Sequence, residues 1–420
     1  MMQRLINREL WSNREFIAFV LANSVERFAA SALTIMLAFH VYDARKSAFD
    51  IALLGFAQVI PALAFALHGG EIADRTSRRR LVLLTVSLLI ALCGGLVVVS
   101  VVDDWLVPAL LLAAFLSATI RAYQTPAAVG LEAQVLPLHL VLKGVPVIAT
   151  TARISDMVGP VAMGFVWAAW GAAATYGVLG VLFALCWLGF ALGIGEKPVP
   201  AHPAGGPGPI ARIAEGVRYV VGNQVLIGSM ALDLFAVFFG GAAALLPIFA
   251  TDILAVGPSG FGLLRASIAA GALTAAIFSI RFMPRANAGL ALHLIIAGFG
   301  VAMIAFGLST NFILSMALLF VSGICDGLSM VIRHAILRLA SPEEMRGRIA
   351  AVRMVFVSSS NELGAVQMGL SASLLGPARA VVLGGVLTLG VVATVATLAP
   401  KLRNLDLGSY GITPRAAPAE

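Results

Sequence analysis

The chain has 420 residues, of which 60% are hydrophobic and only 12% are charged, and its net charge is +7. Its apolar residues recur in runs of about 20, the length of a helix that crosses a hydrocarbon core, and this pattern excludes a water-soluble globular protein. Alternating strand-like segments of about 10 residues do not dominate, which argues against a membrane barrel. In lipid, every backbone N–H and C=O group must find its hydrogen-bond partner within the protein, so the membrane-spanning segments are expected to be helices. We therefore expect an all-α polytopic membrane protein.

The apolar runs predict twelve transmembrane helices, with these approximate bounds in chain order: 16–41, 48–69, 81–101, 105–125, 143–169, 172–194, 222–250, 258–281, 288–308, 311–337, 347–373 and 378–399. When residues at helix ends are counted with the adjoining loops, 19 of the 28 Lys and Arg residues lie on one side of the membrane, and only Arg45, Lys46 and Arg379 lie on the other. The positive-inside rule then predicts that both termini are cytosolic. The basic balance thus reflects topology, and the expected partner is the lipid bilayer, not nucleic acid.

Residues 195–219 form the only long polar connection between predicted helices, and the proline-rich first part of this stretch cannot be helical. We interpret it as a cytosolic linker. It divides the chain into an N-terminal six-helix half (1–194) and a C-terminal six-helix half (220–400), which a cytosolic tail (401–420) follows.

The two halves also resemble one another in sequence. Asn13 matches Asn223 at an offset of 210, and Gly159 matches Gly364 at an offset of 205. Ordered matches at a nearly constant offset predict two pseudo-symmetric halves that arose by parallel duplication. The substrate site is then expected between the halves, near the middle of the membrane.

Charged residues are costly at the bilayer centre and mark helices that face protein or water. The first predicted helix carries one polar stripe at spacings of four, four and three: Asn23, Arg27, Ser31 and Thr34. Glu26 lies at its edge. One interpretation is a Glu26–Arg27 pair that only locks this helix to a neighbour. The other is a Glu26 that faces a cavity and carries a proton or cation.

The tenth predicted helix repeats this geometry with Ser322, Asp326, Ser329 and Arg333. Asp233 on the seventh helix and Glu362 on the eleventh add two more intramembrane acids. Burial favours the neutral form of a carboxylate, so the four acids are candidate proton carriers: Glu26, Asp326, Asp233 and Glu362. A structural ion pair is the alternative role for each of them.

The remaining intramembrane charges are candidates for a polar cavity. Arg153 and Asp156 on the fifth helix are three residues apart on one face, and we expect them to pair with each other. Arg265 lies on the eighth helix. With Asn23, Arg27 and Arg333, these residues complete the predicted cavity lining.

The loop between the second and third helices, residues 69–80, reads GGEIADRTSRRR. It resembles the G-x-x-x-D-R-x-G-R-R-R loop of major facilitator superfamily transporters, with Ser77 in place of the second glycine. This resemblance assigns a gating role to Gly70, Asp74, Arg75 and Arg78.

Residues 121–126, RAYQTP, are similar to the R-x-x-Q-G element of the superfamily's fourth helix, with Thr125 in place of glycine. The resemblance implies that Asp74 pairs with Arg121 at the cytosolic face and holds the inner gate shut while the transporter opens outward. The alternative is an arginine at a helix end that only extends toward the interface.

Two further elements carry the resemblance. Residues 155–164, SDMVGPVAMG, look like the G-x-x-x-G-P-x-x-G-G element of export-type members and imply a hinge at Gly159 and Pro160. Residues 342–348, PEEMRGR, mirror the earlier loop in charge and add Arg346 and Arg348 as gate candidates. The resemblance extends over nearly the whole chain to the branch that contains the bacterial enterobactin exporter.

No phosphate-binding loop, hydrolase triad or H-E-x-x-H motif is present, so we expect neither an enzyme nor a cofactor. The three cysteines are isolated in apolar segments, and no metal site is predicted. The expected function is proton-driven export of a small amphiphilic molecule, such as a siderophore-like compound or a drug, by a monomer in the inner membrane of a bacterium. The alternatives are a uniporter or importer of a small metabolite, and a membrane sensor that keeps this fold without transport.

Overall fold

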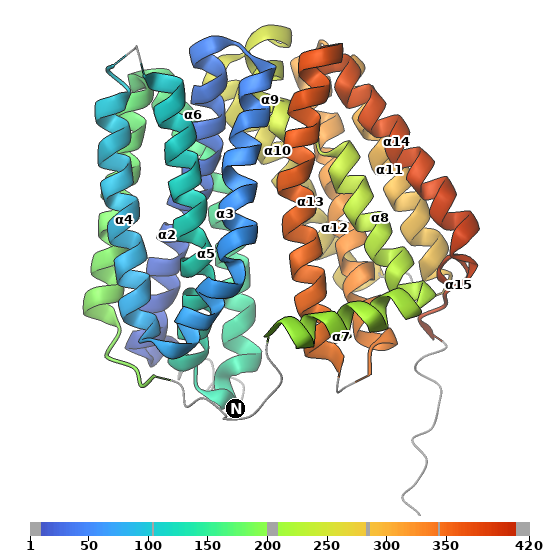
Figure 1. Cartoon of the computed structure of the whole chain (residues 1–420), viewed down its shortest axis with the longest axis horizontal. Helices are drawn as coiled ribbons and strands as arrows, with labels where there is room; N and C mark the ends of the chain where they lie inside the picture. The colour runs from blue at the N-terminus through green and yellow to red at the C-terminus, as the bar shows by residue number, and fades with distance from the viewer. Residues whose placement is uncertain (1–9, 103–104, 200–208, 283–285, 343–344, 409–420) are drawn as a thin grey trace, which may run out of the picture. The chain divides into compact units, whose positions relative to one another are not determined.

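Helices form all the regular secondary structure in the residues that the computed structural model describes, which are 10–102, 105–199, 209–282, 286–342 and 345–408. The expected all-α fold is confirmed (Figure 1). In chain order the elements are α2 (Arg14–Arg45), α3 (Ala48–Arg75), α4 (Arg78–Val99), α5 (Leu106–Val135), η1 (Leu138–Leu140), α6 (Val141–Gly193), α7 (Pro209–Gly222), α8 (Gln224–Gly240), η2 (Ala242–Leu245), α9 (Leu246–Ile248), η3 (Phe249–Ile253), α10 (Gly257–Phe282), α11 (Ala288–Leu308), α12 (Phe312–Ala340), α13 (Arg346–Leu375), α14 (Pro377–Leu398) and α15 (Pro400–Arg403).

Ten helical segments of the described chain are long and apolar enough to cross a membrane. α6 counts once among them, although Gly171, with a φ of 78°, interrupts its 53 residues and separates the predicted fifth and sixth helices. α13 contributes a shorter apolar stretch, Leu363–Leu375. The polytopic character is therefore confirmed, and the count of twelve crossings stays a prediction.

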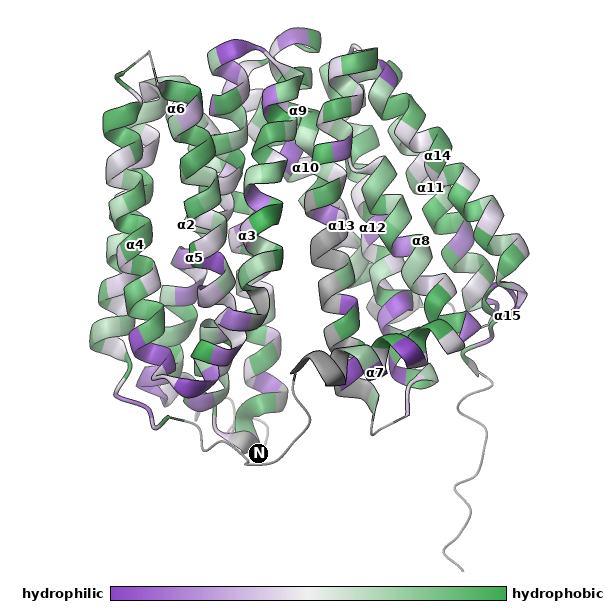
Figure 2. Cartoon of the chain, viewed as in Figure 1, coloured by the Kyte–Doolittle hydropathy of each residue, from purple (hydrophilic) through white to green (hydrophobic). Residues whose placement is uncertain are grey.

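Hydropathy follows the helices in the way that a membrane requires. α4 is largely hydrophobic along its length, and hydrophilic residues gather at the end where the helix begins (Figure 2). That end carries Arg78, Arg79 and Arg80 in the first turn, and the Ser77 side chain caps it by accepting a hydrogen bond from the Arg80 N–H. The sequence predicts that the edge of the bilayer lies here, where the charged first turn of α4 meets its apolar length.

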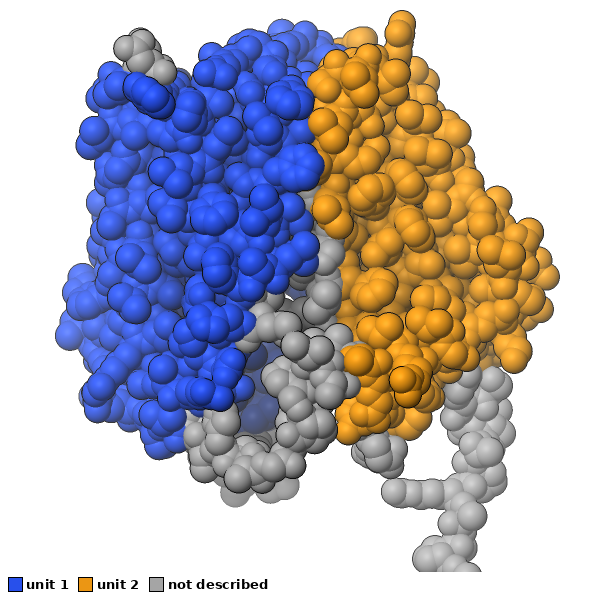
Figure 3. Space-filling model, in the orientation of Figure 1, with its two compact units in different colours: residues 1–206, 244–266 blue, residues 207–243, 267–420 orange. Residues whose placement is uncertain are grey.

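The described chain forms two compact units (Figure 3). Unit 1 comprises residues 1–206 and 244–266, and unit 2 comprises residues 207–243 and 267–420. In unit 1, α2 and α4 pack against α6, and α3 packs against α5. In unit 2, α11 packs against α12 and α14, and α8 packs against α13 and α14. α10 therefore begins in unit 1 and ends in unit 2.

The first long helix of each predicted half starts with the same cap. The Asn13 side chain accepts a hydrogen bond from the Phe16 N–H at the start of α2. The Asn223 side chain accepts from the N–H groups of Val225 and Leu226 at the start of α8. An asparagine at this position satisfies backbone donors that a helix start leaves unpaired. The two caps are the residues matched at an offset of 210.

α7 begins within the predicted linker, at Pro209. A proline at the first position of a helix costs little, because its missing N–H would be unpaired there anyway. The helix packs against α8 and α13. Apolar side chains of these three helices form one buried cluster: Val220, Leu226, Met230, Ile349 and Val352.

α5 extends further than the sequence predicts. Its expected end at residue 125 is wrong, because the helix continues through Pro126 to Val135. Proline is tolerated inside membrane helices where neighbouring groups satisfy the freed backbone carbonyl. Arg121 therefore lies in the middle of α5, not at its end.

Candidate functional site

The polar stripe of α2 meets α6 in unit 1. Arg27 Nη2 donates to Asp156 Oδ2 at 2.5 Å, and Ser31 Oγ donates to the backbone carbonyl of Asp156 at 3.4 Å. The expected Arg153–Asp156 pair is therefore wrong, since the partner of Asp156 is on another helix. Arg153 is exposed.

Gly159 explains why the two helices come close enough for this pair. A Cβ at residue 159 would lie 2.4 Å from the carbonyl oxygen of Phe28, the residue that follows Arg27. Only glycine permits this approach of two helix backbones. Gly159 therefore acts here through packing against α2, and its role as a hinge with Pro160 stays a prediction.

Glu26 lies beside this pair without joining it. It is partly buried and hydrogen-bonded by the side chain of Gln124 on α5. It forms no ion pair with any described residue, and the cations that act on it are Arg27 and Arg121. The interpretation of Glu26 as a lock paired to Arg27 is wrong, because Arg27 is bound to Asp156.

α5 contributes the third side of this cluster. Arg121 Nη1 donates to Thr34 Oγ1 of α2 at 2.9 Å. Gln124, one turn further along, is 4% exposed, and its side-chain oxygen has no hydrogen-bond partner in the described chain. We define the unit 1 cluster by Glu26, Arg27, Arg121, Gln124 and Asp156. Asn23, 9% exposed, lies one turn before Arg27 on α2.

A second group of charges lies in unit 2. Asp233 of α8 pairs with Arg333 of α12, and the two side chains are only 11% and 6% exposed. Asp326 lies about two turns before Arg333 on α12, with its carboxylate 3.9 Å from the guanidinium and its side chain 41% exposed. Arg353 of α13 adds a positive charge that acts on Asp233. We define the unit 2 cluster by Asp233, Asp326, Arg333 and Arg353.

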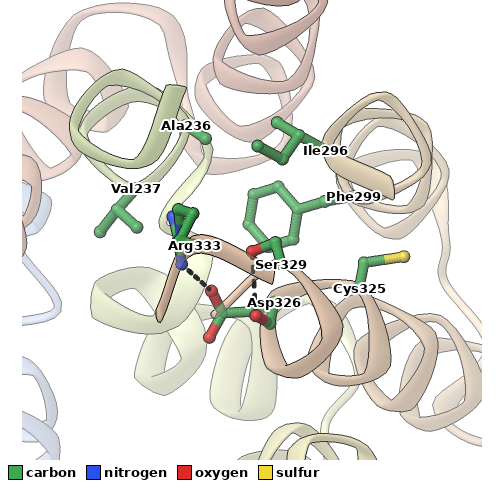
Figure 4. A pocket seen from close by; sticks show the side chains of 8 residues that line it. All are labelled: Ala236, Val237, Ile296, Phe299, Cys325, Asp326, Ser329 and Arg333. Carbon is green, nitrogen blue, oxygen red and sulfur yellow. Dashed lines mark hydrogen bonds and ion pairs between the residues drawn. The ribbon is translucent and has the colours of Figure 1, made fainter. Parts of the chain in front are cut away.

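Figure 4 shows Arg333, Asp326 and Ser329 directed toward one another at the edge of a small cavity. Ser329 Oγ donates to the backbone carbonyl of Asp326 at 2.9 Å. The cavity has a volume of about 10 Å³, so it can hold at most one water molecule. The cavity is too small to hold an organic substrate.

Four further residues of the predicted site lie on α10 and α13. Glu362 and Arg346 lie on α13, but their side chains are outside the described part of the structure. Arg265 lies on α10, in the part that belongs to unit 1. Arg348, at the start of α13, pairs with Glu215 of α7.

The loop between α3 and α4 is held by its own charges. Asp74 pairs with Arg78 at 3.2 Å, and Arg78 Nη1 also donates to the backbone carbonyl of Gly130 on α5 at 3.0 Å. Arg75 pairs with Glu71. The expected contact between Asp74 and Arg121 is wrong for this structure, because each residue binds a different partner.

The same loop reaches the end of α6. Arg80 donates to Glu196 at 2.9 Å, and this hydrogen bond holds the pKa of the Glu196 carboxyl below its ordinary value. Arg79 donates to the backbone carbonyl of Ala191 at 2.6 Å. The loop therefore connects α3, α4, α5 and the end of α6 within unit 1.

The gating role of Gly70 stays a prediction, and the close helix contact in this region is made by its neighbour Gly69. A Cβ at Gly70 would meet nothing within 4 Å, whereas a Cβ at Gly69 would lie 2.3 Å from the carbonyl oxygen of Ala122. Gly69 is thus the residue that lets α3 approach α5. The only signal for it was the Gly-Gly pair.

A second contact was not predicted at all. Tyr42, near the end of α2, donates a hydrogen bond to Asp252 in η3, and the Phe39 and Phe261 rings stack with centroids 5.3 Å apart. These contacts hold the segment 244–266 within unit 1. Tyr42 and Asp252 are 210 positions apart in the chain, and Phe39 and Phe261 are 222 apart, so no local sequence pattern could indicate these contacts.

The contacts of the loop predict how two substitutions combine. We expect Asp74→Asn and Arg121→Ala to reduce the initial rate of transport independently, so that their effects multiply, because the two residues share no partner. The double variant Asp74→Asn/Arg78→Ala should lose less of the transport rate than the two single effects combined, because these two residues form one ion pair. A strong coupling between Asp74 and Arg121 in this double-mutant cycle would instead show that they pair in another state of the protein.

Comparisons with known proteins agree with these features. The family model described as "Major Facilitator Superfamily" matches residues 19–365. The chain is 26% identical over 322 residues to the enterobactin exporter EntS of Escherichia coli O139:H28 (strain E24377A / ETEC). The match covers 74% of this chain and 73% of the relative. The enterobactin exporter EntS of Escherichia fergusonii matches to the same extent.

Solved structures share the fold. A mutant of the nucleoside transporter NupG has a TM-score of 0.70 at 12% identity, covering 92% of this chain and 100% of the other. A POT family transporter in complex with 5-aminolevulinic acid has a TM-score of 0.72 at 12% identity, covering 93% and 97%. A bacterial homologue of the human lysosomal transporter Spinster, in an inward-facing and unoccupied conformation, has a TM-score of 0.66 at 16% identity, covering 96% and 98%.

Proposed function

The chain belongs to the Major Facilitator Superfamily, and on that premise we propose that it exports a small amphiphilic molecule in exchange for protons. The observation that supports proton coupling is the state of Glu26. It is a partly buried acid within a membrane helix that is hydrogen-bonded to Gln124 but ion-paired to no described residue. A carboxylate free of a salt bridge can gain and lose a proton without breaking one, so it suits a carrier.

The other acids divide according to their partners. Asp156 and Asp233 are bound by Arg27 and Arg333, and protonating either one would break that pair. Asp326 is held more loosely, at 3.9 Å from the guanidinium of Arg333, and is partly exposed. We therefore propose Glu26 and Asp326 as the carriers, ahead of Asp233 and Glu362.

Export and the class of substrate rest on the relatives. The two relatives matched by sequence are enterobactin exporters, and the Gly159-Pro160 element resembles that of export-type members. We propose a siderophore-like compound or a drug as the cargo. The competing proposals are a uniporter or importer of a small metabolite and a sensor that does not transport.

The test is proton flux in proteoliposomes that contain the purified protein. Siderophores, drugs and lipids are added singly, and the internal pH is followed. We expect at least one amphiphile to drive protons across the membrane, at a rate that protein-free liposomes do not show. Substrate flux that is indifferent to a pH gradient would favour the uniporter, and no flux with any compound would favour the sensor.

We further propose that the protein spans the inner membrane of a bacterium as a monomer, with both termini in the cytosol. The prediction is that a cysteine at position 76 (Thr76→Cys), in the loop between α3 and α4, reacts with a membrane-impermeant maleimide only after the cells are opened. A cysteine at position 45 (Arg45→Cys) should react in intact cells, because the loops with the most Lys and Arg residues stay in the cytosol and this loop lies on the opposite side. The parent chain with its three natural cysteines is the control, and labelling of position 76 in intact cells would reverse the topology.

A further inference from the structure

An apolar groove runs along unit 1 between α2 and the second half of α6. It has a volume of about 470 Å³, which is within the range of sites that bind organic ligands. Its lining holds no charged side chain: Ala18, Leu21, Ala22, Val25, Leu185, Cys186, Leu188, Gly189, Leu192 and Gly193. Neither candidate cluster contributes to it.

The groove exists because its floor is small and its walls are large. A Cβ at Gly193 would lie 2.3 Å from Cβ of Ala18, and a Cβ at Gly189 would lie 3.0 Å from Cβ of Ala22. These residues let the two helices meet closely at the floor. The leucines beside them stand clear of the protein, with Leu21 62% exposed and Leu192 84% exposed. A hydrocarbon chain laid along the floor would cover these walls.

One end of the groove carries a free positive charge. Arg14 precedes Ala18, Leu21 and Val25 at helical spacings of four, three and four, so it continues the face of α2 that lines the groove. Arg14 is exposed and forms no ion pair with any described residue. The neighbouring charges cancel, because Glu15 pairs with Lys197 at 2.5 Å. Arg14 is therefore a cation at this end of the groove that no described acid neutralises.

The length of the groove fits one leaflet of a bilayer. Arg14 and Val25 are eleven residues apart, which corresponds to roughly 16 Å along a helix. Half of the hydrocarbon core is about 15 Å thick. A lipid with its phosphate at Arg14 would place its acyl chain along the whole groove and end it near the middle of the membrane.

We propose that this groove binds one acyl chain of an anionic phospholipid whose headgroup phosphate pairs with Arg14. Cationic residues at the edge of the membrane recognise anionic headgroups, and the apolar groove supplies the contact area that distinguishes a bound lipid from bulk lipid. The proposal does not depend on which substrate is transported.

The experiment measures lipid retention by native mass spectrometry of the full-length protein in mixed micelles with phosphatidylglycerol or phosphatidylcholine. We expect one tightly bound phosphatidylglycerol. Arg14→Gln should weaken its binding about fivefold, the effect of one basic residue near an anionic surface. It should weaken phosphatidylcholine much less, because the choline ammonium already neutralises the phosphate of that lipid. The double variant Leu21→Ala/Leu192→Ala should weaken both lipids, because it removes the walls and not the charge.

Matched controls exclude a general effect of charge or apolar area. Arg45→Gln removes the same charge at the opposite end of α2, and Leu84→Ala/Leu88→Ala removes exposed leucines from α4. Both controls should retain the lipid like the parent chain. The proposal is overturned if Arg14→Gln retains phosphatidylglycerol at the parent level, or if Arg45→Gln loses it equally. All the substituted side chains are exposed, and thermal unfolding of each variant verifies that it is folded.

Discussion

Glu26→Gln is expected to abolish the accumulation of substrate driven by a pH gradient and to leave downhill exchange of substrate in place. Glutamine resembles the protonated carboxyl group in size and charge, and it can still hydrogen-bond Gln124, so the helices should pack as before. A carrier must change its charge during the cycle, and glutamine cannot. The measurement is substrate flux into inverted vesicles with and without a pH gradient.

Three other neutral variants of acidic residues are compared with Glu26→Gln. Asp326→Asn should behave like Glu26→Gln if it shares the coupling proton. Asp156→Asn should instead lower the yield of folded protein, because it leaves Arg27 without its partner. Glu71→Gln, at an exposed acid of the loop that pairs with Arg75, is the neutral control. Proton antiport as assigned here is wrong if pH-driven accumulation stays at the parent level in the neutral variants of all four candidates, Glu26, Asp233, Asp326 and Glu362.

Arg333→Met is expected to destabilise the protein by about 3–5 kcal/mol, because it leaves the carboxylate of Asp233 buried without a cation. Both side chains of this pair are nearly inaccessible, so water cannot replace the lost partner. The measurement is thermal unfolding of the purified protein in detergent, together with the yield of folded protein.

The double variant Asp233→Asn/Arg333→Gln separates the charge from the packing. It removes both charges at once and should regain much of the lost stability. The exposed pair of Lys46 and Asp43 is the matched control, since its side chains are 48% and 44% exposed and Lys46→Gln should cost no more than about 1 kcal/mol. If Arg333→Met unfolds at the parent temperature, Arg333 does not neutralise Asp233 in the folded protein.

Several features of this protein follow from its sequence by itself. The apolar runs predicted the helical membrane fold, because each segment must satisfy its own backbone in lipid whatever surrounds it. The residues around Asp74 and Gly159 indicated the superfamily before any contact was known. Asn13 and Asn223 begin helices in the structure, because capping depends only on the next few residues. Such signals are local, and they can therefore be read from the order of the residues.

Only the tertiary structure decided which charges meet. Asp156 lies three residues after Arg153 in the sequence, but it pairs with Arg27, because Gly159 lets α2 approach α6 closely. Asp74 binds Arg78 of the following helix, and Arg121 lies in the middle of α5, where it reaches Thr34. An ion pair within a membrane forms with whichever opposite charge helix packing brings into reach, and packing depends on close approaches such as that of Gly69 to Ala122. Spacing along the chain names the charges that need a partner, whereas the packing of the helices selects that partner.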